Sequence, residues 1–172
     1  MRPASAADSA ALAVVAAATF PLACPPHTTD EAKAAHIATH LTPARFDDYL
    51  ADPARDLFLA ESGDEAVGYT MLIAGEPTDP DVAASLTTRP TAELSKCYVL
   101  PGHHGAGIAS ALMTATLEAA RARGAAAVWL GVNEENAKAQ RFYDKSGFTR
   151  VGRKRFLVGD RYEDDFVMER VF

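Results

Sequence analysis

The stretch SKCYVLPGHHGAGIASALM, residues 95–113, decides the fold. It joins an apolar β-strand pattern to a Pro-Gly break, a glycine-spaced turn and the start of an amphipathic helix. The first turn of a helix leaves backbone N–H groups unpaired and carries the positive end of the helix dipole, so it can bind an anion such as phosphate. A ligand could approach this backbone directly, because little or no side chain stands on Gly105, Ala106, Gly107 and Ala109.

Working outward, further elements are predicted on both sides of this stretch. On its N-terminal side we expect a short strand at MRPA and then an alanine-rich helix starting near Ser5 to Asp8. One or two short helices follow over 30–51, interrupted at Thr42-Pro43. We then expect strands at 56–61 and 66–74, a loop over 75–90 and a strand over 91–100. On its C-terminal side we expect a helix over 105–123, a buried strand over 125–132, a helix over 136–148, and strands over about 149–158 and 161–171 joined by a Gly159-Asp160 hairpin loop.

This order predicts an α/β fold class. The sheet is mixed and mostly antiparallel, with a central parallel pair around the 105–123 helix and helices flanking it. At 172 residues the chain fits a single domain over residues 1–172. Apolar residues make up 48% and charged residues 23%, which is ordinary for a globular protein.

Charge and cysteine content narrow the class of protein. The net charge of −6 argues against nucleic-acid binding, which needs a basic surface, and mildly favours a cationic substrate. Cys24 and Cys97 are far apart and belong to no metal-ligand pattern, so we expect a reducing, cytoplasmic location and no disulfide framework. His36 and His40 are four residues apart on a predicted helix, but no third ligand is evident, so we expect no metal and place them on the surface or in a substrate pocket.

The apolar run AALAVVAAATFPLAC, residues 10–24, has two readings. It ends in small residues and a cysteine, as a lipoprotein signal would. Against a signal, the charged region before it is only Arg2, Asp8 follows, and about 14 apolar residues are too few to span a bilayer as a helix. We therefore favour a helix of the folded domain and expect no membrane association.

The glycine spacing matches neither common nucleotide-binding motif. It is not the GxGxxG of dinucleotide-binding folds and not the GxxxxGK[ST] of phosphate-binding loops, and residues 101–110 contain no lysine. NAD binding and kinase chemistry are therefore disfavoured.

Two segments resemble one known family. LPGHHGAGIASALM resembles the acyl-CoA signature [QR]-x-x-G-x-[GA] of the GNAT superfamily of N-acetyltransferases, mapped onto His104, Gly105, Ala106, Gly107, Ile108 and Ala109, with histidine in place of the usual glutamine or arginine. NEENAKAQRFYDKSGF is similar to the family's N-x-x-A-x-x-F-Y-x-x-x-G-F segment, with Asn136, Ala139, Phe142, Tyr143, Gly147 and Phe148 in place. The resemblance extends over essentially the whole chain, although residues 20–55 match only in length and helicity.

The resemblance implies the GNAT fold, acetyl-CoA as co-substrate and acetyl transfer to an amine. It places the Tyr143 phenol near the thioester sulfur, where an O–H donor can protonate the departing thiolate. It suggests Glu93 as the proton acceptor, through water or with a pKa raised by burial, although Glu93 could equally lie in solvent at a strand end. Strand alternation would put Glu93 on the same face as Ser95 and Cys97, with Lys96 and Tyr98 opposite.

The resemblance also implies how the rest of the site is divided. The backbone of Tyr98 to Leu100 would pair with the pantetheine arm, with an N–H near Val99 as oxyanion donor, and Asn136 would contact that arm or cap its helix. The acceptor would lie against the N-terminal helices and the 75–90 loop. His27, His36, Asp79 and Asp81 could meet an amine there, or could equally be solvated. Cys97 is expected to be a small buried side chain and not a nucleophile.

The predicted function is N-acetyl transfer from acetyl-CoA to a primary amine through a ternary complex. The acceptor is a small molecule (polyamine-like, amino-acid-like or drug-like) or a protein or peptide amine. The alternative is a non-catalytic acyl-CoA-binding sensor or regulatory subunit. A homodimer is also predicted, because the terminal hairpin offers an edge strand that can pair with a second copy of the chain.

Overall fold

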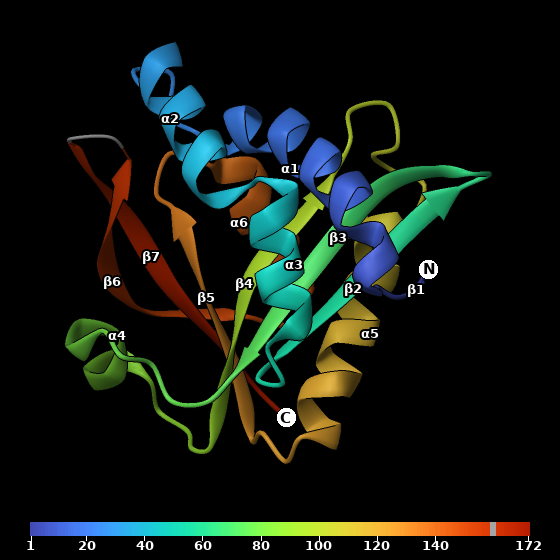
Figure 1. Cartoon of the computed structure of the whole chain (residues 1–172). Coiled ribbons are helices and arrows are strands. Elements are labelled where there is room, and N and C mark those ends of the chain that lie inside the picture. The colour runs from blue at the N-terminus through green and yellow to red at the C-terminus, as the bar shows by residue number, and fades with distance from the viewer. Residues whose placement is uncertain (159–160) are drawn as a thin grey trace.

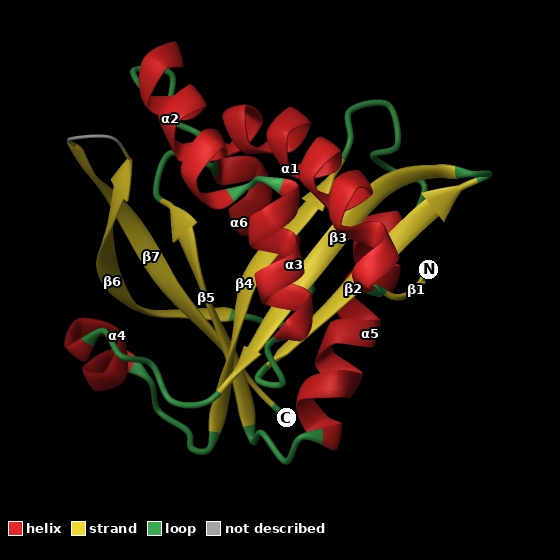
Figure 2. Cartoon of the chain, viewed as in Figure 1, coloured by secondary structure: helices red, strands yellow, loops and turns green. Residues whose placement is uncertain are grey.

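The computed structural model describes residues 1–158 and 161–172. Its strands form one seven-stranded sheet in the order β1-β2-β3-β4-β5-β7-β6. All neighbouring strands are antiparallel except β4 and β5, which confirms the predicted mixed sheet with its central parallel pair (Figure 2). The strands are β1 Arg2–Pro3, β2 Arg55–Ser62, β3 Glu65–Ala74, β4 Thr91–Val99, β5 Ala127–Asn133, β6 Thr149–Val158 and β7 Arg161–Val171.

Helices cover both faces of the sheet, as Figure 1 shows, with α1 and α3 on one face and α5 on the other. Leu12 and Val15 of α1 and Phe46 of α3 pack on Leu59 and Met71. On the opposite face, Met113 and Leu117 of α5 pack with side chains of β4, β5 and α6. The helices are α1 Ser9–Ala23 after a 3₁₀ turn at Ala6–Asp8, α2 Asp30–His40, α3 Pro43–Ala51, α4 Pro80–Ser85, α5 Ile108–Ala122 and α6 Ala137–Lys145.

The parallel pairing of β4 with β5 is short. Only Thr91, Ala92 and Glu93 of β4 pair with β5, opposite residues 127–129. Beyond Glu93 the two strands diverge, as Figure 1 shows at their upper ends. A β-bulge adds to this divergence: Leu94 pairs with Leu72 and Lys96 pairs with Met71 of β3, so Ser95 is the extra residue. The sheet therefore opens at its centre, between the C-terminal ends of β4 and β5.

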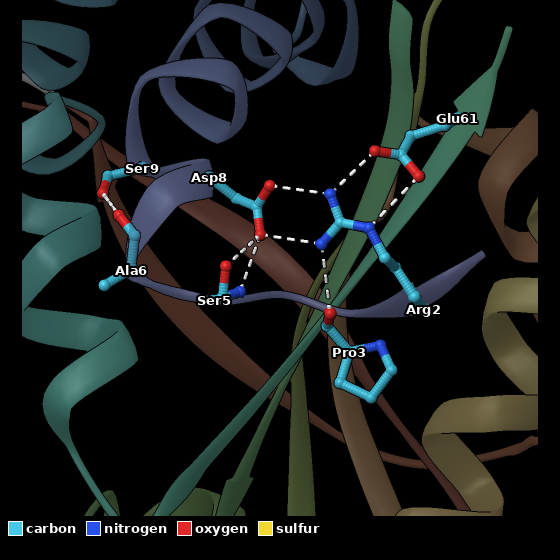
Figure 3. A network of polar contacts seen from close by, with 7 residues as sticks. All are labelled: Arg2, Pro3, Ser5, Ala6, Asp8, Ser9 and Glu61. Atoms are coloured by element: carbon cyan, nitrogen blue, oxygen red, sulfur yellow. Dashed lines mark hydrogen bonds and ion pairs between the residues drawn. The ribbon is translucent and has the colours of Figure 1, made fainter. Parts of the chain in front are cut away.

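An ion-pair network fixes the start of the chain (Figure 3). The Arg2 guanidinium lies 2.8 Å from Asp8 Oδ1 and 2.7 Å from Glu61 Oε1, which joins the turn before α1 to strand β2. The Asp8 carboxylate also accepts the N–H of Ser5, and these bonds hold its pKa well below the usual value. The network fixes where α1 begins on the sheet, and hence where its far end lies.

Helix α1 is a core helix of this fold. Together with its leading 3₁₀ turn it runs over 18 residues, Ala6–Ala23, which is long and apolar enough for a membrane span by length and composition. The expectation that this run is too short was therefore wrong. The helix nevertheless packs one side, including Leu12, Val15 and Ala16, against the sheet, as a buried helix of a folded domain does.

Two predicted boundaries differ from the structure. The segment 75–90 is not all loop, because Pro80–Ser85 form α4, whose first turn is capped by the Asp79 carboxylate. Helix α5 begins at Ile108, three residues later than predicted, because Gly105 and Gly107 both adopt positive φ angles outside the helical region. The predicted hairpin loop at 159–160 lies outside the described residues.

Candidate functional site

A cavity of about 610 Å³ fills the opening between β4 and β5. Residues 93–99 of β4 form one wall, and the other wall comes from β5, α6 and β7. The turn before α5 closes one end, while the last turn of α1 and His36 of α2 line the other. The cavity thus extends from a helix N-terminus to a region covered by the N-terminal helices.

The glycine turn has the geometry of an anion site. Gly105 and Gly107 have φ angles of +86° and +79°, which favour glycine strongly over other residues. A Cβ at either position would meet no atom within 4 Å, so the turn faces open space. Gly107 is the N-cap of α5, and no side chain caps the helix there. The first N–H groups of α5 therefore point into space that a ligand can occupy.

Nine of the eleven residues predicted to bind the cofactor line this cavity. They are Tyr98, Val99, His104, Gly105, Gly107, Ala109, Asn136, Ala139 and Tyr143. The remaining two, Ala106 and Ile108, are not among the lining residues. The Ile108 side chain packs instead beside Leu112 and Val67, so only its backbone is available to a ligand at the turn.

His104 connects three elements at this end of the cavity. Its Nε2 atom lies 2.9 Å from the carbonyl oxygen of Val99, and its Nδ1 atom lies 3.1 Å from Nζ of Lys138 on α6. A carbonyl can only accept, so Nε2 donates and Nδ1 accepts from the ammonium. His104 thus caps the end of β4 and brings the Lys138 ammonium to the glycine turn.

Helix α6 places Tyr143 on the cavity wall. The Asn136 Oδ1 atom accepts the N–H of Ala139 at 3.0 Å, so Asn136 caps α6, one of the two roles predicted for it. The Tyr143 ring packs between Phe142 and Phe148, with centroids 5.5 Å and 5.9 Å away. Burial raises the pKa of Tyr143 well above its usual value, so its hydroxyl stays protonated and can act as a donor.

The bulge at Ser95 changes which side chains of β4 share a face. Glu93 pairs with Ile73, which packs in the α1 and α3 layer, whereas Cys97 packs in the α5 and α6 layer. Lys96, close to the Tyr49 ring, lies on the side of Glu93. The predicted sharing of one face by Glu93 and Cys97 was therefore wrong, because a bulge shifts the alternation by one residue.

The titrating groups of β4 are strongly affected by burial. Burial raises the pKa of Glu93, while the nearby Lys154 and Lys96 ammonium groups oppose the rise. Glu93 lines the cavity and is partly buried. Burial raises the pKa of Cys97 to about 12, so its thiol is protonated and unsuited to nucleophilic attack, in line with the prediction.

Strand β7 contributes carboxylates that the sequence analysis missed. Glu163 and Asp165 both line the cavity and are both buried. Burial is the main reason that the pKa of Asp165 rises to about 6. Glu163 lies 2.9 Å from Nε2 of His27. The alternating acidic positions in the stretch YEDDF, 162–166, were the signal that could have found them, since residues two apart on a strand share a face.

Lys154 of β6 lines the same cavity as Glu163 and Asp165. Its side chain passes so close to Gly131 that a Cβ at position 131 would overlap its Cε atom. Its ammonium lies 5.6 Å from the centroid of the Trp129 ring. The cavity is therefore lined by both signs of charge, the Lys154 ammonium and the carboxyl groups of Glu163 and Asp165.

Only some of the segments expected near the acceptor line the cavity. The last turn of α1 and His36 line the cavity, and His36 stacks on Phe20 at 4.2 Å. The 75–90 loop does not line it: Asp79 caps α4, and α4 packs on the sheet near Trp129. Asp79 and Asp81, which could have met the acceptor, do not line this cavity. Within residues 1–158 and 161–172, no group of three or more His, Cys, Asp or Glu side chains could hold a metal ion.

A family model shows the class of protein to which the chain belongs, the acetyltransferases. The family model described as "Acetyltransferase (GNAT) family" matches residues 19–148, and the chain therefore belongs to the GNAT family, as its two motifs indicated. It is 48% identical over 163 residues to an uncharacterized N-acetyltransferase of Mycobacterium tuberculosis, covering 95% of this chain and 97% of that protein.

Two other comparisons are more distant. A 65-residue segment is 45% identical to a mycothiol acetyltransferase of Beutenbergia cavernae, covering 36% of this chain and 22% of that protein. The structure of the PaiA N-acetyltransferase from Thermoplasma acidophilum in complex with coenzyme A is similar over 99% of this chain and 97% of that chain, with a TM-score of 0.77 and 18% identity. At that identity the likeness shows the fold alone.

Proposed function

We propose that this protein transfers the acetyl group of acetyl-CoA to a primary amine of a small molecule in a ternary complex, in the cytoplasm. One observation carries the proposal: a single cavity joins the open N-terminus of α5 to a region lined by carboxylates. A reaction between two bound molecules needs both binding regions in one continuous space.

The residues at the α5 end fit the cofactor. The unpaired N–H groups around Gly107 and the Lys138 ammonium would hold its diphosphate. The edge of β4 beyond Glu93 has no partner in β5, so its backbone groups are available to the amides of the pantetheine arm. The N–H near Val99 would serve as oxyanion donor. Asn136, which caps α6, would hold the start of that helix beside the pantetheine arm.

The other residues fit the chemistry of the transfer. Deprotonating an alkylamine of pKa about 10.4 at pH 7 costs about 4.6 kcal/mol, so a proton acceptor is useful. Glu93 would take that proton, directly or through water, since it lines the cavity and burial raises its pKa. The amine nitrogen then attacks the thioester carbonyl carbon, the C–S bond breaks, and the Tyr143 hydroxyl donates a proton to the departing sulfur.

The relatives support the reaction class more than the acceptor. The related mycothiol acetyltransferase is named for a small molecule, but the matched segment covers only part of either protein. The solved structure with coenzyme A supports an acyl-CoA site in this fold.

Calorimetric titration tests the proposal directly. We expect acetyl-CoA and free CoA to bind near the micromolar range and NADH not to bind, followed by amine-dependent thiol release in a screen of acceptors. Absence of binding by both CoA species would overturn the proposal. Binding without turnover of any amine would favour the non-catalytic sensor, and light scattering of the same sample would test the predicted dimer.

A further inference from the structure

Lys96 is a partly buried lysine whose ammonium has no hydrogen-bond or ion-pair partner among the described residues. It lies on β4 directly after the bulged Ser95, and it lines the cavity. Its contact with the aromatic ring of Tyr49 is long, at 5.9 Å from Nζ to the ring centroid. In the part of the chain that the structure describes, its ammonium makes no hydrogen bond and no ion pair.

Such a group is costly unless an anion pairs with it. Removing an ammonium from water carries a penalty of several kcal/mol, which pairing and hydrogen bonds can offset. Burial, with a smaller contribution from the Arg55 cation, lowers the pKa of Lys96 to about 8, and the Glu93 carboxylate opposes the change. Most Lys96 side chains therefore still carry a charge at pH 7.

The opposite wall of the cavity carries two carboxylates. Glu163 and Asp165 line it from β7, across the opening from β4. Lys154 also lines the cavity near Asp165, and Glu93 lies on the side of Lys96. Both signs of charge therefore face this space, which favours a ligand that itself carries both signs.

Resting on the proposed function, we propose that the acceptor is an amine that also carries a carboxylate, such as an amino acid or a short peptide. Lys96 binds the carboxylate of the acceptor. Glu163 and Asp165 attract its ammonium and hold the amine on the side of the cavity where β5 and β7 lie. Lys96 thereby acts as a specificity-determining residue and takes no part in proton transfer.

The test compares acceptors that differ only in the carboxylate. Initial rates are measured for the common amino acids and their dipeptides, for the corresponding amino-acid amides, and for simple alkylamines. For the best acid we expect kcat/KM to be at least tenfold above that of its amide. Lys96→Met should reduce this preference to about twofold or less, mainly by raising KM for the acid, while turnover of the amide changes little.

Two further variants separate charge from structure. Lys96→Arg keeps the cation and should keep most of the preference, even if Lys96→Met proves unstable. Lys145→Met removes a lysine at the C-terminal end of α6, outside the cavity lining, and should have no effect. Affinity for acetyl-CoA should be the same for the wild-type protein and for all three variants.

Several results would overturn the inference. They are equal use of acids and amides by the wild-type protein, turnover only of amines without a carboxylate, a uniform loss on all acceptors in both Lys96 variants, or weaker acetyl-CoA binding by Lys96→Met. Failure of the wild-type protein to bind CoA would instead refute the proposed function, so the two failures are distinguishable.

Discussion

Nε2 of His104 donates to the carbonyl oxygen of Val99 at 2.9 Å, and this bond fixes how the basic side chains are arranged at the glycine turn. Because Nε2 carries the proton donated to Val99, Nδ1 accepts a hydrogen bond from the Lys138 ammonium at 3.1 Å. The family pattern has glutamine or arginine at position 104. In this chain the cation beside the turn is Lys138 of α6, two residues after the N-cap Asn136, and position 104 itself does not supply it.

We predict that Lys138→Ala weakens acetyl-CoA binding about three- to tenfold, because one ammonium near the diphosphate is lost. The loss should shrink in high salt, since exposed charges are screened. Calorimetry at two salt concentrations checks both effects. Lys145→Ala, on the same helix but outside the cavity lining, is the matched control. Equal affinities for wild type and Lys138→Ala would show that the ammonium does not reach the ligand.

Gly107 and Gly124 form a second matched pair. They have φ angles of +79° and +81°, and a Cβ on either would meet nothing within 4 Å. Alanine at each position should therefore cost similar stability, about 1–2 kcal/mol, in denaturant unfolding. Only Gly107 lines the cavity, so Gly107→Glu should abolish acetyl-CoA binding while Gly124→Glu retains it. Full affinity in Gly107→Glu would mean that the site lies elsewhere.

Tyr143→Phe should lower kcat tenfold or more with little change in acetyl-CoA affinity. The substitution removes only the hydroxyl that would protonate the departing sulfur, while the ring remains packed on Phe142 and Phe148. Steady-state kinetics with thiol detection measures kcat, and calorimetry measures the affinity. Tyr162→Phe, at an exposed position of β7, is the control and should behave as wild type. Unchanged turnover in Tyr143→Phe would exclude the proton-donor role.

Asp165→Asn should stabilise the protein at pH 7.5 and make it less active. The folded state raises the pKa of this carboxyl from 3.8 to about 6. The folded protein therefore retains a proton that the unfolded chain has released, and stability falls as pH rises from about 4 to about 6. Asparagine removes that loss, a gain of about 3 kcal/mol well above pH 6 and none below pH 4.

Urea unfolding of Asp165→Asn at pH 4 and pH 7.5 measures this difference. Asp164→Asn, at the exposed neighbouring position, should be neutral at both pH values. The kcat/KM of the wild-type protein should rise with pH around 6 as Asp165 ionises, and Asp165→Asn should lose that inflection. A stability difference that is the same at both pH values would contradict the role assigned to burial.

Much of the fold was predictable because its signals are local. The Pro-Gly break, the spacing of Gly105 and Gly107 and the apolar periodicity after them identify a strand, a turn and a helix. The boundary of α5 was missed by three residues, because a glycine with positive φ cannot belong to the helix that it precedes. Helix α4 was missed because its six residues, beginning with Pro80, are too few for a periodic pattern.

The cofactor end of the site was more predictable than the acceptor end. Residues around the turn and α6 belong to two contiguous motifs, whereas Lys96, Glu163 and Lys154 are brought together by three strands distant in sequence. The bulge at Ser95 was also invisible, because a bulge depends on the register of β4 with β3. Simple alternation therefore put Glu93 on the face of Cys97 and opposite Lys96, whereas Glu93 and Lys96 share a face.

The short pairing of β4 with β5 has a thermodynamic consequence. Three residue pairs form the β-sheet joint between β1–β4 and β5–β7, so the joint has few backbone hydrogen bonds of its own. A ligand in the opening contacts both halves and binds only while they are joined. A ligand concentration of a hundred times Kd would then add about 2.7 kcal/mol to the free energy of global unfolding. The backbone amides of β4 and β5 should show this most clearly, as slower hydrogen exchange.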